Sequence, residues 1–201
     1  MRKLGIVFLI LGVGIVARYG FEHWQAMKSV NALDNQAGSP AEHQPPDFSE
    51  ADLVDTLGAK PDFETGEGVA TLVIPKINKS YEVFWGTDEK TLAKGVGMYV
   101  SQWTVPPDGE KHTVLSGHRD TVFRPLGDLE TGDRLYVSYL GVDYEYEINK
   151  IWITHAEDRT VIVEKEEPTL TLTTCYPFNY IGSAPDRYII QAGLVQKGKL
   201  L

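Results

Sequence analysis

The chain runs through Thr171-Leu172-Thr173-Thr174-Cys175-Tyr176-Pro177-Phe178-Asn179, where a run of threonine and leucine ends at a cysteine shortly before a proline. Threonine is β-branched and favours strands, whereas proline and asparagine favour loops. The stretch therefore predicts a strand that ends at Cys175, with a loop directly after it. Strand ends are places where a thiol can be reached from solvent.

Similar short runs, rich in β-forming residues and bounded by Gly, Pro, Asn or Asp, fill the chain from residue 68 onward. They lie at 69–74, 80–85, 112–116, 134–139, 144–154, 169–175 and 187–194. Many short strands at this spacing predict a mainly β fold, either a barrel or a sandwich. Between the strands, residues 88–94 predict a short helix, and residues 121–129 predict one irregular helical turn that Pro125 interrupts.

Composition limits the possible functions. The 201 residues allow one domain of ordinary size, and the formal net charge of -9 without any Lys/Arg-rich stripe does not indicate a nucleic-acid surface. With Cys175 as the sole cysteine, an intrachain disulfide and Cys-rich zinc spacings are excluded. A lone cysteine is more often a buried apolar filler than a functional thiol, so its neighbours must decide between the two.

The N-terminus predicts a membrane segment. Met1-Arg2-Lys3 precedes an apolar stretch at 4–17, which is shorter than the roughly 20 residues of a full span and would also suit the core of a cleaved signal peptide. No small-x-small cleavage site is evident, and Arg18, Tyr19 and Trp24 suit a membrane interface. These features favour a transmembrane anchor over residues 1–24, with a cytoplasmic N-terminus and an extracellular body.

A linker is expected between this anchor and the strands. Residues 37–46 have turn and linker composition, and residues 47–57 predict a short amphipathic helix with Ser49 as a possible cap. The expected division is an anchor at 1–24, a linker at 25–67 and a β domain at 68–201.

A nucleophilic cysteine needs a proton partner and a positive environment, because the thiolate is the reactive form and a free thiol titrates near ~8.5. His118 supplies the first, since it lies in Ser116-Gly117-His118-Arg119-Asp120 at the end of a predicted strand. Arg187 supplies the second, at the start of the last strand. Each residue by itself could be an ordinary surface side chain. The remaining histidines lie in the anchor region or linker, or lack a glycine-flanked strand end: His23, His43, His112 and His155.

Together these residues resemble the sortase family. The resemblance is carried by Thr-Leu-x-Thr-Cys at 171–175, by Ser-Gly-His-Arg-Asp at 116–120 and by Arg187 twelve positions after the cysteine. The Thr-Cys-Tyr-Pro-Phe continuation and Ala184-Pro185-Asp186-Arg187-Tyr188 are most similar to class D sortases of Gram-positive bacteria. The resemblance covers residues 68–195. It implies a closed, sortase-type β-barrel of about eight strands with short helices.

The resemblance also implies a cysteine transpeptidase that cleaves a Leu-Pro-x-Thr-small sorting signal after Thr, through a thioacyl intermediate. Cys175 would be the nucleophile, His118 the general acid and base, and Arg187 the group that stabilises the carbonyl and oxyanion. Thr174 is a secondary oxyanion candidate, and Asp120 could orient the imidazole, cap a turn or pair with Arg119. The implied partners are secreted proteins with C-terminal sorting signals, a cell-wall precursor or peptidoglycan amine, and the membrane through the anchor. No cofactor is implied.

Other possibilities stay open at this point. The acidic loop before the cysteine strand is similar to that of calcium-stimulated sortases, but it has no EF-hand-like ligand spacing, so we expect a solvated loop without metal. Its acidic residues are Glu157, Asp158, Glu164, Glu166 and Glu167. A cysteine peptidase or amidase would use the same Cys175 and His118 but resolve the acyl-enzyme with water. A non-catalytic, membrane-anchored β domain would instead bury an inert Cys175.

Overall fold

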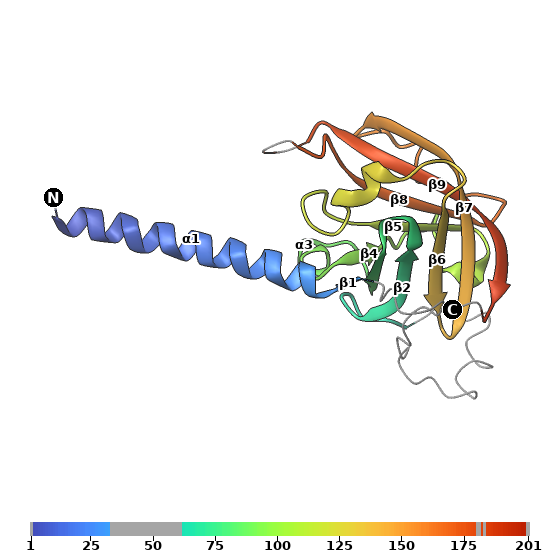
Figure 1. The fold of residues 1–201 in the computed structure, drawn as a ribbon, viewed down its shortest axis with the longest axis horizontal. Helices are drawn as coiled ribbons and strands as arrows, with labels where there is room; N and C mark the ends of the chain where they lie inside the picture. The colour runs from blue at the N-terminus through green and yellow to red at the C-terminus, as the bar shows by residue number, and fades with distance from the viewer. Residues whose placement is uncertain (1, 33–61, 180–181, 183, 200–201) are drawn as a thin grey trace.

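A helix projects from a β-barrel in the computed structural model, which describes residues 2–32, 62–179, 182 and 184–199 (Figure 1). The helix α1 (Arg2–Lys28) is followed at once by the short strand β1 (Val30–Ala32). The predicted linker at 37–46 and the predicted helix at 47–57 lie outside the described residues.

The barrel is built from the strands that follow. They are β2 (Gly68–Ile74), β3 (Lys79–Trp85), β4 (Val96–Met98), β5 (His112–Ser116), β6 (Arg134–Tyr139), β7 (Val142–His155), β8 (Thr169–Tyr176) and β9 (Asp186–Gly198). Short helical segments connect them: η1 (Pro75–Ile77), α3 (Glu89–Leu92), η2 (Pro107–Gly109) and η3 (Arg124–Asp128).

The strand order is β1-β3-β2-β6-β7-β9-β8-β5-β4, and β3 also pairs with β4. This extra pairing closes β2 to β9 into a barrel of eight strands, while β1 extends the sheet from β3 on the outside. The β3–β4 and β5–β8 pairs are parallel, whereas the other pairs are antiparallel. The prediction of a closed, mainly β barrel of about eight strands is confirmed.

All seven strands expected from sequence form, and β7 and β9 extend beyond their predicted bounds. The three-residue strands β1 and β4 were not predicted, because such short segments carry no readable alternation. The predicted helix at 88–94 forms as α3, and the Asp88 carboxylate caps it by accepting hydrogen bonds from the backbone N–H groups of Lys90 and Thr91. The irregular turn expected at 121–129 forms as η3.

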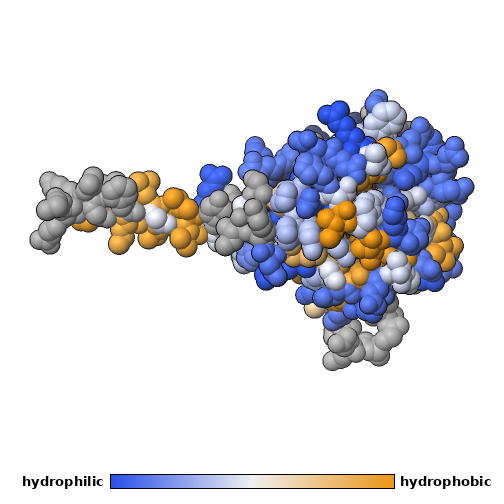
Figure 2. Space-filling view, turned by 90° about the horizontal axis from the view of Figure 1, so that it is seen from above, coloured by the Kyte–Doolittle hydropathy of each residue, from blue (hydrophilic) through white to orange (hydrophobic). Residues whose placement is uncertain are grey.

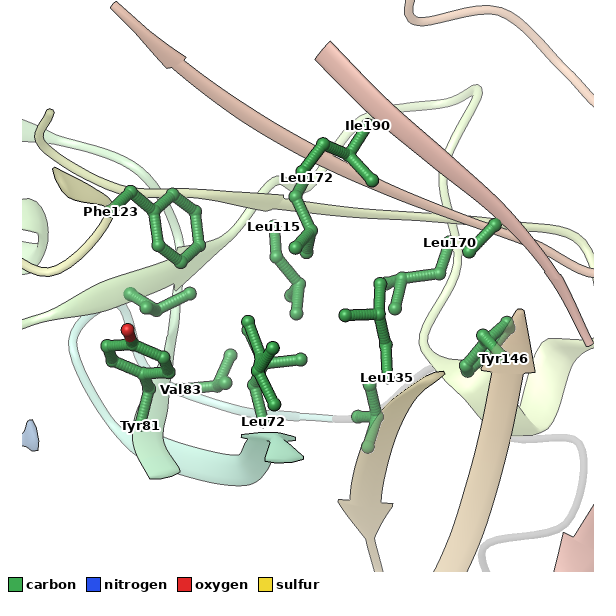
Figure 3. Close-up of a cluster of buried hydrophobic side chains, with 14 of the residues drawn as sticks. Leu72, Tyr81, Val83, Leu115, Phe123, Leu135, Tyr146, Leu170, Leu172 and Ile190 are labelled. Carbon is green, nitrogen blue, oxygen red and sulfur yellow. The ribbon is translucent and has the colours of Figure 1, made fainter. Parts of the chain in front are cut away.

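The barrel interior is a single apolar core, in which side chains from facing strands meet (Figure 3). Alternation along each strand decides which residues enter it, since successive side chains point to opposite faces. Tyr81 and Phe123 pack edge to face with ring centroids 5.9 Å apart. The labelled core residues include Leu72, Val83, Leu115, Leu135, Leu170, Leu172 and Ile190.

The helix α1 exposes aliphatic side chains beyond the barrel (Figure 2). Ile10 and Val16 are 63% and 72% exposed. Within the described part of the chain, no helix combines the length and apolar character that crossing a membrane requires. The end of the helix is tied to the barrel, because the Glu82 amide donates to the Ser29 carbonyl and Ser29 packs where a side chain at Gly95 would stand.

Candidate active site

The candidate residues gather at one end of the barrel, where three neighbouring strands end or begin. The central strand is β8, which pairs with β5 on one side and with β9 on the other. In the antiparallel β8–β9 register, Cys175 lies directly opposite Arg187. Opposite residues in an antiparallel pair have side chains on the same face, about 5 Å apart at Cβ. The thiol and the guanidinium therefore project from adjacent positions.

His118 is brought to the same edge by the parallel β5–β8 pair, in which Ser116 lies beside Thr173. The alignment continues past the end of β5: the Gly117 amide donates to the Thr173 carbonyl at 3.2 Å, and the Thr174 hydroxyl donates to the Gly117 carbonyl at 2.7 Å. His118 follows Gly117 directly, so it comes one residue after the last contact between this segment and the strand that ends at Cys175.

The turn that carries His118 is tight, because the Phe123 amide donates to the His118 carbonyl at 3.0 Å. Gly117 makes the turn possible. A Cβ added there would stand 2.7 Å from the Val122 side chain and 2.8 Å from the Phe123 ring. The glycine before His118 in the sequence motif is therefore required by packing.

Cys175 and Arg187 belong to one outward-facing surface. Leu170, Leu172 and Ile190 enter the core, so the residues that alternate with them on β8 and β9 face outward. Leu115 does the same on β5. We call this surface the outer face; it carries His112, Val114 and Ser116 on β5, Thr171, Thr173 and Cys175 on β8, and Arg187, Ile189 and Gln191 on β9.

The guanidinium of Arg187 is held at the strand end by backbone carbonyls of the residues just before it. Its Nη1 donates to the Asp186 carbonyl at 2.9 Å and to the Ala184 carbonyl at 3.4 Å. A guanidinium has five N–H groups, so Nη2 and Nε retain donor capacity for a further oxygen. Cys175 itself is partly exposed.

The other candidates at this edge occupy different environments. Thr174 is buried, and its hydroxyl is engaged with Gly117. Asp120 is exposed, and within the described residues no hydrogen bond joins it to His118. Arg119 is buried instead, and its Nη2 donates to the Gly182 carbonyl at 2.7 Å, which ties the histidine turn to the segment before β9.

An aromatic cluster closes the barrel below the nucleophile. Tyr176 stacks on Tyr188 with ring centroids 6.0 Å apart, and Phe178 contacts both rings. Burial, with a further contribution from Tyr176, raises the pKa of Tyr188 above its ordinary value. The cluster gives the strand end a rigid apolar support.

The loop at 156–168 starts at this edge, where the Ala156 amide donates to the Pro185 carbonyl at 2.9 Å. The hydroxyls of Thr154 and Thr160 donate to the Asp158 carboxylate and lower the pKa of Asp158 to about 2. This carboxylate is thus engaged in organising the loop. Across the described ranges, no three His, Cys, Asp or Glu side chains form a group that could hold a metal ion.

The geometry agrees with the comparison to known proteins. Residues 72–195 match the family model described as a sortase domain. The chain belongs to the sortase family.

Comparison with individual relatives shows which sortases this chain is similar to. It is 38% identical over 196 residues to Sortase D of Bacillus subtilis, covering 94% of this chain and 97% of that protein. The catalytic domain of B. anthracis SrtD is 59% identical, with a TM-score of 0.61 over 70% of this chain and 95% of that chain. A Clostridium perfringens Sortase D5 transpeptidase is 28% identical, with a TM-score of 0.63 over 74% of this chain and 90% of that chain.

These matches confirm the resemblance to class D sortases. Sortases are cysteine transpeptidases, and this chain is therefore an enzyme of that type. The alternative of a non-catalytic β domain is thereby excluded.

The sequence missed two features of this region. Arg119 was considered only as a partner of Asp120, although it is buried and binds the segment before β9. His112 was set aside because it is not at a glycine-flanked strand end. The sequence does contain one signal for His112, since it alternates with Val114 and Ser116 on the strand that leads to His118.

Proposed function

We propose that Cys175 attacks the threonine carbonyl of a Leu-Pro-x-Thr-small sorting signal and passes the acyl group to a cell-wall amine. One observation carries the proposal: Cys175 and Arg187 are direct cross-strand partners, and the strand on the other side of β8 leads into His118. A nucleophile, a permanent cation and a titratable imidazole thus share one barrel edge.

In the first step, the Cys175 thiolate forms a bond to the threonine carbonyl carbon. Negative charge develops on the carbonyl oxygen, and Arg187 donates hydrogen bonds to it, which suits a cation that cannot lose its proton. The C–N bond then breaks, and His118 gives its proton to the departing amine. The product is a thioester on Cys175.

In the second step, an amine from a cell-wall precursor or from peptidoglycan attacks the thioester carbonyl. The amine loses a proton to His118, the C–S bond breaks, and Cys175 leaves as the thiolate, so the thiolate and the protonated imidazole are both regenerated. Thr174 supports this geometry through its hydrogen bond to Gly117, which fixes the residue before His118.

We further propose that residues 1–24 hold the catalytic domain of residues 68–201 at the outer surface of the cell membrane, through the intervening segment 25–67. The support is the row of exposed aliphatic side chains on α1, which would be costly to leave in water. Fractionation of cells that express the full chain, with and without residues 1–24, tests this. Recovery of the full chain in the soluble fraction would refute it.

The catalytic proposal is tested by incubating the full chain in detergent with a Leu-Pro-x-Thr-Ala-x peptide. We expect mass spectrometry to detect an adduct on Cys175, and this chain has one cysteine, so the site of a thioester is unambiguous. Cys175→Ala should form no adduct and no transfer product. Retained transfer in that variant would overturn the assignment.

Adding an amine acceptor separates transfer from hydrolysis by a cysteine peptidase or amidase. Transfer requires that the acceptor increases peptide turnover and appears in the product. If water alone resolves the thioester, and the acceptor is not incorporated, the hydrolase alternative is correct.

A further inference from the structure

The end of the outer face away from Cys175 holds a buried histidine. His112 is 0% exposed, and so is Thr171, which lies on the same face of β8 two residues beyond Thr169, the register partner of His112. Thr171 precedes Cys175 by four residues on the same face of β8, a spacing of about 13 Å at the rise of a strand. The buried imidazole and the nucleophile therefore share one strand surface.

Both ring nitrogens of His112 are hydrogen-bonded. Nδ1 lies 2.6 Å from the Val163 carbonyl oxygen, and Nε2 lies 2.8 Å from the Thr171 hydroxyl. A carbonyl can only accept, so Nδ1 carries the proton. The Gln191 amide in turn lies 3.4 Å from the Thr171 hydroxyl oxygen as a donor. Burial lowers the pKa of His112 and favours the neutral ring, in which Nε2 accepts from the Thr171 hydroxyl.

Val163 belongs to the loop at 156–168, whose path connects the two ends of the outer face. The loop leaves β7 beside Asp186, next to Arg187, and returns at Thr169 beside His112. Within the loop, the Val161 side chain is buried, and the exposed ion pair of Lys111 with Glu164 adds a weaker link between the loop and the start of β5. A peptide bound along the outer face from Cys175 would meet this loop as its wall.

We propose that His112 is a positioning residue that pins the Val163 carbonyl to the outer face and so sets the wall of the peptide-binding groove of this transpeptidase. The proposal rests on the function proposed above. The imidazole makes no contact with substrate in this role. It is the buried contact that links the loop to both β5 and β8.

Two amide substitutions separate the two hydrogen bonds. In His112→Asn the amide nitrogen takes the place of Nδ1 and can still donate to Val163. In His112→Gln the longer amide reaches the place of Nε2 instead, so it can pair with Thr171 but not with Val163. Both replacements are polar and smaller than the ring, so their packing costs are similar.

Hydrogen exchange and kinetics on the full chain in detergent test the proposal together. For His112→Gln we expect the amides of residues 156–168 to exchange at least tenfold faster and the KM for the sorting peptide to rise at least fivefold, with kcat within twofold of wild type. For His112→Asn, the exchange rates of residues 156–168, the KM and the kcat should all stay within threefold of wild type. Alkylation of Cys175 by iodoacetamide should be unchanged within twofold in both.

The proposal is overturned if the loop exchanges equally in the two variants, if faster loop exchange leaves KM unchanged, or if the whole barrel exchanges faster in His112→Gln. Exchange and alkylation need no turnover. If the wild-type chain transfers no peptide at all, the proposed function fails. Hydrogen exchange of the loop still shows whether the contact between His112 and Val163 holds it in place.

Discussion

The two ends of the outer face of β5, β8 and β9 use similar residues for opposite purposes. At the sealed end, His112, Thr171 and Gln191 are linked by hydrogen bonds, and the first two are fully buried. At the open end, Cys175 is partly exposed, and Arg187 is hydrogen-bonded to the backbone of its own strand start. The same strand geometry thus presents a satisfied polar network and, four residues further, an accessible thiol.

The difference follows from what covers each end. Buried polar groups must have their partners within the protein, because an unsatisfied one costs about 1–3 kcal/mol. The loop at 156–168 supplies such a partner at Val163. Near Cys175 the side chains can keep donor capacity in reserve for a substrate oxygen, because solvent still reaches them. The following changes test this contrast.

The largest effect is expected at Arg187. Arg187→Ala removes the cation opposite Cys175 and should lower kcat/KM by about a hundredfold or more, as loss of an oxyanion donor does. Arg187→Lys should recover only part of the activity, since an ammonium cannot present the same fork of donors. Peptide transfer assays measure both. Lys197→Ala, which breaks an exposed ion pair with Glu110, is the matched control; equal losses in the two alanine variants would remove Arg187 from the site.

A smaller effect is expected at Thr174. Thr174→Val keeps the shape of the buried side chain but leaves the Gly117 carbonyl without its donor, at a cost of about 1–3 kcal/mol in the free energy of unfolding. Transfer activity should fall about tenfold, because the residue before His118 is then less constrained. Thr174→Ser should restore most of the stability, measured by denaturation, and most of the activity, measured by peptide transfer. A valine variant with full activity would show that this bond does not position His118.

Acidification should lower the free energy of unfolding through His112, at the sealed end of the outer face. Burial is the main cause that lowers the pKa of His112, with Lys165 acting in the same direction and the Val163 carbonyl opposing. Lys111 and Glu164 form the exposed ion pair nearby, and Thr171 and Gln191 are neutral. The unfolded chain therefore takes up a proton near pH 6.5 while the folded chain does not. Stability is fully present above that pH and falls as the pH is lowered.

The free energy of unfolding changes with pH by at most about 1.4 kcal/mol per pH unit from this one group. Urea denaturation between pH 7.5 and pH 5 measures it in wild type and in His112→Asn. The variant should lose this part of the slope, whereas His155→Gln, at an exposed position, should retain it. An unchanged slope in His112→Asn would mean that the imidazole is not the group that titrates.

The smallest effect is expected at Asp120. The residue is exposed and forms no hydrogen bond with His118 within the described residues, so Asp120→Asn should change kcat/KM by less than about threefold. A triad-like orienting carboxylate would cost far more when replaced by an amide. A loss of a hundredfold in transfer assays would restore Asp120 as the orienting group.

Much of the fold could be predicted because long strands carry their own pattern. The runs at 112–116 and 134–139 match β5 and β6: β6 alternates between buried and partly exposed residues, whereas β5 is a short apolar and β-branched run that is buried almost throughout. The strands β1 and β4 could not be predicted, because three residues contain less than two periods of alternation. Their pairing with β3 depends on the tertiary structure.

The candidate site could be predicted as a set of residues but not as an arrangement. The order of His118, Cys175 and Arg187 in the sequence pointed to the family. The facing of Cys175 and Arg187 depends on the β8–β9 register, which no local pattern determines. His112 was missed for the same reason, since its partners Val163 and Thr171 lie more than fifty positions along the chain.

The parallel pairing of β5 with β8 has a consequence for folding. It joins residues as far apart as His112 and Thr171, 59 positions along the chain, and such long-range parallel contacts form slowly because a large loop must close first. The hairpins of β2 with β3 and of β6 with β7 are local and can form earlier. The barrel edge that carries both His118 and Cys175 is therefore assembled only when β5 has paired with β8, which we expect to follow the local hairpins.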